Sequence, residues 1–86
     1  MNNVTTKQME FIPKLKEWLD SKGNGFYLII GKRRRNVVFF IYLLDSIERL
    51  ESYSEEDREV LNLLSRNYYG EGKGLALRHW WKGVGY

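Results

Sequence analysis

The residues of this chain best suited to binding chemistry form an unbroken run of four cations: Lys32, Arg33, Arg34 and Arg35. Adjacent positive charges repel one another, and a polyanion relieves this repulsion while releasing its own counterions. Arginine also matches phosphate with two parallel hydrogen bonds. We therefore expect the run, named here the basic cluster, to contact the phosphate backbone of a nucleic acid, DNA or RNA, with little sequence preference. The alternative is a solvated turn whose charges only keep a sheet edge soluble.

A second set of candidates lies near the C-terminus, where tryptophans adjoin cations. In an alternating strand over residues 75–81, Trp81 shares a face with the leucines, while Trp80 faces the other way beside Arg78. A ring between cations suits stacking on a base or insertion into a protein partner; packing of Trp80 under a helix is the structural alternative. The predicted accessory residues are Lys73, Arg78 and Lys82 for phosphate contact, and Trp80, Trp81 and Tyr86 for stacking or anchoring.

The residue types of this chain give little support for an enzymatic function. The chain has no cysteine and one histidine, which removes thiolate nucleophiles, disulfides and the usual zinc ligand sets. The acidic residues of 55–59 are better explained as the favourable first turn of a helix than as a magnesium site. The glycine-rich segment 70–74 does not have the glycine spacing of a phosphate-binding loop, and it lacks the Ser or Thr that such a loop carries. We predict no enzymatic activity, no catalytic residue, no metal site and no cofactor.

Length and composition predict one small folded domain over residues 1–86. Hydrophobic residues make up 43% and charged residues 29%, which is ordinary for a globular domain. The net charge is +3, but residues 1–35 carry +5, residues 36–65 carry −5 and residues 66–86 carry +3. No apolar run reaches the roughly 18 residues of a membrane span, and the N-terminus does not resemble a secretion signal. We expect a cytoplasmic protein that does not bind membranes.

Two classes of function remain open. The first is a small, non-catalytic nucleic-acid-binding protein. The second is a protein-binding module or inhibitor of the kind carried by phages and other mobile elements, with the C-terminal aromatic residues inserted in a partner and the arginines paired with its carboxylates. A long basic hairpin in so small a domain also suggests a homodimer. A mobility shift with mixed DNA and RNA, set against pull-down from a lysate, separates the two classes.

The basic cluster must be positioned by the elements around it, beginning with an N-terminal helix. Thr5 and Gln8 have the spacing of a capping box, and apolar residues recur at helical spacing from Met9 onward. Pro13 predicts either a kink or a later start of the main helix. The helix should end near Lys22.

Two apolar runs flank the basic cluster and lead to alternative folds. Residues 26–31 are short, aromatic and β-branched, which predicts a strand. Residues 36–43 are apolar without a break, so we favour a second strand pairing with 26–31, with the basic cluster at the hairpin tip. The alternative is a mostly α fold in which a long helix spans residues 37–53, capped by Asn36.

The rest of the chain completes an α+β prediction. A short helix from Asp45 should end near Tyr53, and a second should begin at Ser54, which caps it, and close at Gly70. A C-terminal strand over residues 75–81 would follow. The predicted order is therefore an N-terminal helix, a β-hairpin with a basic tip, two helices and a C-terminal strand.

Overall fold

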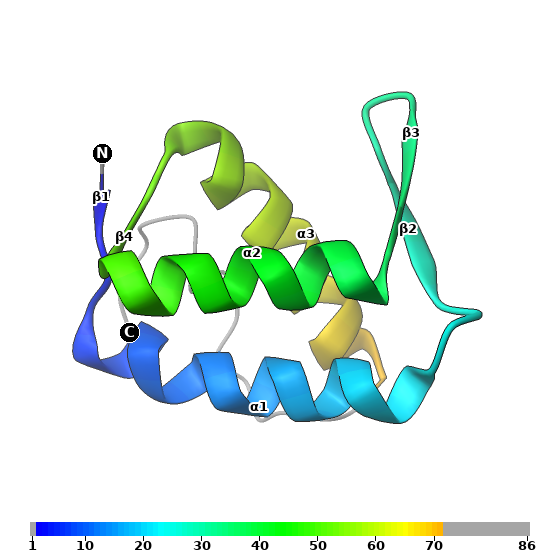
Figure 1. Cartoon of the computed structure of the whole chain (residues 1–86), viewed down its shortest axis with the longest axis horizontal. Coiled ribbons are helices and arrows are strands. Elements are labelled where there is room, and N and C mark those ends of the chain that lie inside the picture. Colours follow the sequence, from blue (N-terminus) through cyan, green and yellow to red (C-terminus); the bar gives the residue numbers. More distant parts are fainter. Residues whose placement is uncertain (1, 72–86) are drawn as a thin grey trace.

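The computed structural model describes residues 2–71 of the chain, and within them the fold is α+β, as the sequence predicts (Figure 1). The helices and strands are β1 (Asn2–Asn3), α1 (Thr6–Lys22), β2 (Tyr27–Ile30), β3 (Arg33–Asn36), α2 (Val37–Leu50), β4 (Ser52–Tyr53) and α3 (Glu55–Gly70). The strands form two antiparallel pairs, β1 with β4 and β2 with β3. The predicted C-terminal strand over residues 75–81 lies outside the described residues.

Helix α1 begins at the predicted capping box. The Thr5 hydroxyl oxygen accepts a hydrogen bond from the Gln8 backbone N–H at 3.1 Å, and the Gln8 side chain accepts one from the Thr5 N–H at 3.0 Å. These two bonds satisfy donors that the first helical turn leaves open. The helix runs unbroken through Pro13, so the alternative start at that residue is wrong. Gly23 ends the helix with a φ of 76°, a conformation that only glycine adopts without strain.

The predicted second strand over residues 36–43 is wrong, because only Asn36 lies in a strand and helix α2 begins at Val37. The alternative of a long helix over 37–53 is closer, although the helix ends at Leu50 and absorbs the short helix expected from Asp45. The prediction assumed that a helix apolar on every side could not fit a thin core. The structure instead leaves part of the apolar surface in water: Val38 is 68% exposed and Tyr42 is 74% exposed.

A hairpin is present, but it is shorter than predicted and its partner strand is the basic cluster itself. Tyr27 lies opposite Asn36, and Ile30 lies opposite Arg33. The chain turns at Gly31 and Lys32, where Gly31 has a φ of 65°. Glycine first in a two-residue loop is the pattern of a type II′ turn, which matches the twist of hairpin strands. Only Lys32 of the basic cluster therefore lies in the turn, and the three arginines form β3.

Helix α3 agrees with its predicted bounds. The Ser54 hydroxyl accepts from the Asp57 backbone N–H at 3.1 Å, and acidic residues occupy the positive end of the helix dipole. The short β1–β4 pair, which the sequence did not predict, joins the N-terminus to the link between α2 and α3.

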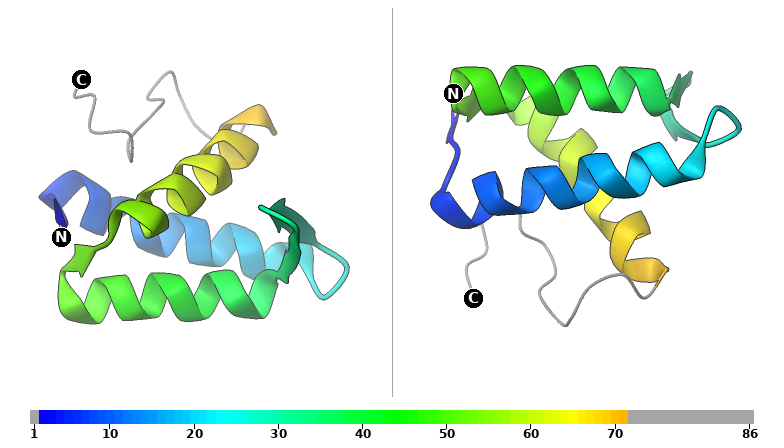
Figure 2. Two further views of the ribbon diagram at one scale, coloured as in Figure 1. Left: turned by 90° about the horizontal axis from the view of Figure 1, so that it is seen from above. Right: turned by 60° about the horizontal axis from the view of Figure 1, so that its bottom comes forward.

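The core lies between the three helices of the described region. Helices α1 and α2 run antiparallel, and α3 crosses them obliquely (Figure 2). At the α1–α2 contact, Lys16 bridges Asp45 and Glu48 of α2. The hydrogen bond to Asp45 raises the pKa of Lys16, with partial burial opposing and Glu48 reinforcing it. The buried apolar side chains are Phe11, Ile12, Leu15, Trp18, Leu19, Val37, Phe40, Leu44, Ile47, Tyr53, Leu61, Leu64 and Tyr68.

Among the helices of residues 2–71, none has the length and apolar character needed to cross a bilayer. The longest, α1, carries charged residues along its exposed side and buries its apolar side in the core.

The junction of β3 and α2 yields a first prediction. The Asn36 side-chain oxygen accepts from the Phe39 backbone N–H at 3.2 Å and so caps α2. Replacing Asn36 by alanine should lower the free energy of unfolding by about 1 kcal/mol, measured by urea denaturation. Asn36→Asp keeps an acceptor and should stay close to the parent. Equal stability of the alanine variant and the parent would contradict the cap.

Candidate nucleic-acid interface

The two strands of the β2–β3 hairpin give the cations of the basic cluster different surroundings. Lys32, in the turn, and Arg33 and Arg34, at the start of β3, are exposed, while Arg35 is partly buried. The hairpin stands beyond the N-terminal end of α2 (Figure 1). The predicted exposure of the cluster therefore holds for three residues, named here the tip cations (Lys32, Arg33 and Arg34), but not fully for Arg35.

The outer face of the hairpin carries one tip cation beside an exposed aromatic ring. The register sets Ile29 opposite Arg34, and directly opposed residues share a face. Tyr27 is the diagonal neighbour on that face, and the Arg34 Cζ atom lies 3.9 Å from the centre of its ring. Tyr27 is 44% exposed and Ile29 is 55% exposed. The guanidinium of Arg34 is thus held against an aromatic ring in contact with solvent.

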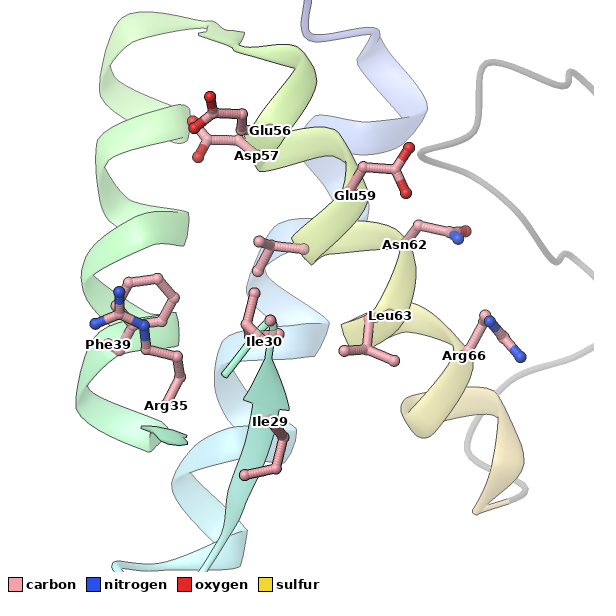
Figure 3. Close-up of a pocket in the computed structure, with 12 residues that line it drawn as sticks. Ile29, Ile30, Arg35, Phe39, Glu56, Asp57, Glu59, Asn62, Leu63 and Arg66 are labelled. Atoms are coloured by element: carbon pink, nitrogen blue, oxygen red, sulfur yellow. The ribbon is translucent and has the colours of Figure 1, made fainter. Parts of the chain in front are cut away.

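The inner face of the hairpin packs partly on the body of the protein and partly lines a groove. Leu28 and Ile30 pack against the core, and the Cζ atom of Arg35 lies 4.5 Å from the centre of the Phe39 ring on α2. Arg35 and Phe39 line one side of a groove of about 600 Å³ between the hairpin, α2 and α3 (Figure 3). Its opposite wall is α3, including Val60, and three carboxylate-bearing residues of that helix also line it. Arg35 thus lies against an aromatic ring in a groove that acidic residues also line, and its side chain contributes packing as well as charge.

Four carboxylate-bearing residues of residues 2–71 pair with cations outside the basic cluster. Besides the Lys16 bridges, Lys22 pairs with Glu71, and Arg58 pairs with Glu55. Glu55 also accepts a hydrogen bond from the Asn2 side chain, and this bond, followed by the charge of Arg58, lowers the pKa of the Glu55 carboxyl. None of the four residues of the basic cluster forms an ion pair with a carboxylate of residues 2–71. Their charge is therefore available to an external anion.

The structure brings together only the N-terminal part of the predicted site. Lys73, Arg78 and Lys82, together with Trp80, Trp81 and Tyr86, lie outside the described residues, and their roles stay predictions. Sequence reasoning did not single out Tyr27 as a partner of the cluster. A signal for it exists: placing Gly31 first in a two-residue turn pairs position 29 with 34 and sets Tyr27 diagonal to Arg34.

Within residues 2–71, no group of three or more His, Asp or Glu side chains is arranged to hold a metal ion. Comparison of the chain with models of protein families, with curated proteins and with solved structures found no match.

The unequal surroundings of the arginines yield a second prediction. Arg35→Ala removes a cation from the Phe39 ring and the packing of its aliphatic stem, and it should lower the free energy of unfolding by about 1 kcal/mol. Arg33→Ala makes the same chemical change at an exposed position and should stay within about 0.5 kcal/mol of the parent. Thermal and urea denaturation measure both. Identical stability of the two variants would mean that the Arg35–Phe39 contact contributes nothing to the fold.

Proposed function

We propose that this protein is a small, non-catalytic nucleic-acid-binding protein that grips the phosphate backbone with the tip cations. The observation that carries the proposal is the tight turn at Gly31 and Lys32, which gathers exposed cations without intramolecular carboxylate partners in residues 2–71 at one end of the molecule. Cations arranged in this way gain most from an anion that carries several charges at close spacing, and a nucleic acid is such an anion.

Arginine and lysine contribute differently to this contact. The planar guanidinium of Arg33 or Arg34 can bind one phosphate through two hydrogen bonds, whereas Lys32 acts as a compact point charge. Contacts of this kind fix the position of the backbone but carry no base information, so we expect weak sequence preference. Additional contacts from Lys73, Arg78 and Lys82, and stacking by Trp80 or Tyr86, belong to the same proposal.

A protein-binding module, working as a homodimer or with another partner, is the second candidate. It is favoured by the exposed side chains of Val38 and Tyr42, which lie one turn apart on α2 and expose 68% and 74% of their surface. This candidate predicts no affinity for nucleic acids. Light scattering at high micromolar concentration tests the homodimer, because a monomeric mass would exclude it.

The third prediction tests the proposed function through salt dependence. Replacing Lys32, Arg33 and Arg34 together by alanine should weaken binding to mixed-sequence DNA and RNA by orders of magnitude at low salt. The slope of log affinity against log salt should also fall, by roughly 0.9 for each lost duplex contact or 0.7 for each contact on a single strand. Fluorescence anisotropy titrations at several salt concentrations measure both quantities. Arg35 is left in place because its substitution would also change stability.

A matched control separates a local contact from a change in overall charge. Lys7→Ala, Lys14→Ala and Arg49→Ala together also remove three positive charges at exposed positions outside the hairpin. This control should keep most of the affinity and the salt slope. Equal losses in the two triple variants would remove the hairpin from the proposal. A parent protein that binds neither DNA nor RNA would end the proposal and favour the protein-binding module.

A further inference from the structure

The outer face of the hairpin combines groups that a duplex backbone alone does not require. Tyr27 and Ile29 expose 44% and 55% of their surface, and the Arg34 guanidinium lies 3.9 Å from the Tyr27 ring centre. A binder of duplex phosphates needs only cations. An exposed ring and an exposed aliphatic side chain beside those cations instead complement a ligand that is both anionic and apolar.

Packing occupies much of the inner face of the hairpin. Here the inner side chains Leu28 and Ile30 pack on the core, and Arg35 lies against Phe39. The outer face, the turn and the exposed Arg33 side chain next to the turn are therefore the parts of the hairpin most open to a ligand, and such a surface suits a strand lying across it.

From this geometry we propose that the outer face of the hairpin binds single-stranded nucleic acid in preference to duplex. The Tyr27–Arg34 pair stacks on an unpaired base, Ile29 contacts the neighbouring nucleotide, and Lys32 and Arg33 bind the adjoining phosphates. A duplex hides the faces of its bases inside the stack, whereas a single strand can expose them to an aromatic ring or a guanidinium plane. This inference rests on the proposed function and names the form of nucleic acid that the site takes.

The dimensions of the hairpin agree with such a contact. A β-strand rises about 3.3 Å per residue, so Tyr27 and Ile29 lie about 7 Å apart along β2. Bases stacked within one strand are about 3.4 Å apart. Two neighbouring bases that contact Tyr27 and Ile29 must therefore separate from each other, which a single strand does at far lower cost than a paired duplex.

The fourth prediction compares a mixed-sequence oligonucleotide without self-complementarity, as DNA and as RNA, with the corresponding DNA duplex. Fluorescence anisotropy at one fixed salt concentration should show at least tenfold tighter binding of a single strand than of the duplex. Tyr27→Leu removes the ring but keeps an apolar side chain, and it should weaken single-strand binding about 5- to 100-fold. Tyr27→Phe keeps the ring and should bind like the parent. Circular dichroism confirms that each variant is folded.

Salt dependence separates stacking from charge. Tyr27→Leu removes no charge, so its log–log salt slope should equal that of the parent even though its affinity is lower. Arg34→Lys keeps the charge but lacks the guanidinium plane; it should also reduce the single-strand preference, and it tests the inference independently should Tyr27→Leu fold poorly.

Three results would overturn the inference: equal or tighter binding of the duplex by the parent, unchanged single-strand binding by both variants, or an equal loss on single strand and duplex. These results leave the phosphate-binding function intact. Binding of neither form by the parent overturns the proposed function itself, so the two failures are distinguishable.

Discussion

No loop separates the hairpin from α2, and this direct junction determines the orientation of everything at that end of the molecule. Asn36 is the last residue of β3 and at the same time the N-cap of α2. Val37 is already buried in the core, so the helix cannot rotate without exposing it. Since β3 leads directly into this fixed point, the orientation of the hairpin, and with it the direction of Arg34 and Arg35, follows from the packing of α2. The cations are thus oriented by a hydrophobic contact that begins two residues after Arg35.

This junction also explains what the sequence could and could not predict. The starts of α1 and α3 were predictable because Thr5, Gln8 and Ser54 act through bonds to backbone groups only three residues away. The choice between strand and helix after Asn36 was not local. Valine, phenylalanine and isoleucine favour strands, but burial of Phe40, Leu44 and Ile47 at helical spacing against α1 and α3 outweighs that propensity.

The residues of the basic cluster could be identified from the sequence, but the face of the hairpin on which each one lies could not. The basic cluster stands out by composition alone, yet assigning its arginines to opposite faces requires the register, and the register depends on a turn centred on two residues. Lengthening the turn by one residue would shift the pairing by one position and exchange the faces of the β3 arginines, because side chains alternate along a strand. The prediction placed all four cations of the basic cluster in the hairpin tip, where this alternation does not apply. It therefore did not distinguish the exposed Arg34 from the partly buried Arg35.

The ring contacts of Arg34 and Arg35 bear on how strongly the hairpin can bind. A long flexible side chain loses rotamer entropy when a ligand immobilises it, at a cost of about 0.5–1.5 kcal/mol. Arg34 is already held against Tyr27, and Arg35 against Phe39, so part of this loss occurs on folding rather than on binding. For Lys32 and Arg33, the described residues show no ring or ion-pair contact of this kind. The hairpin therefore combines one exposed guanidinium held against a ring, that of Arg34, with two exposed cations, Lys32 and Arg33, that have no such contact in the described residues. A guanidinium held in place suits a base stacked at a fixed position, whereas cations without such a contact can bind phosphates whose positions vary. A single strand can offer both.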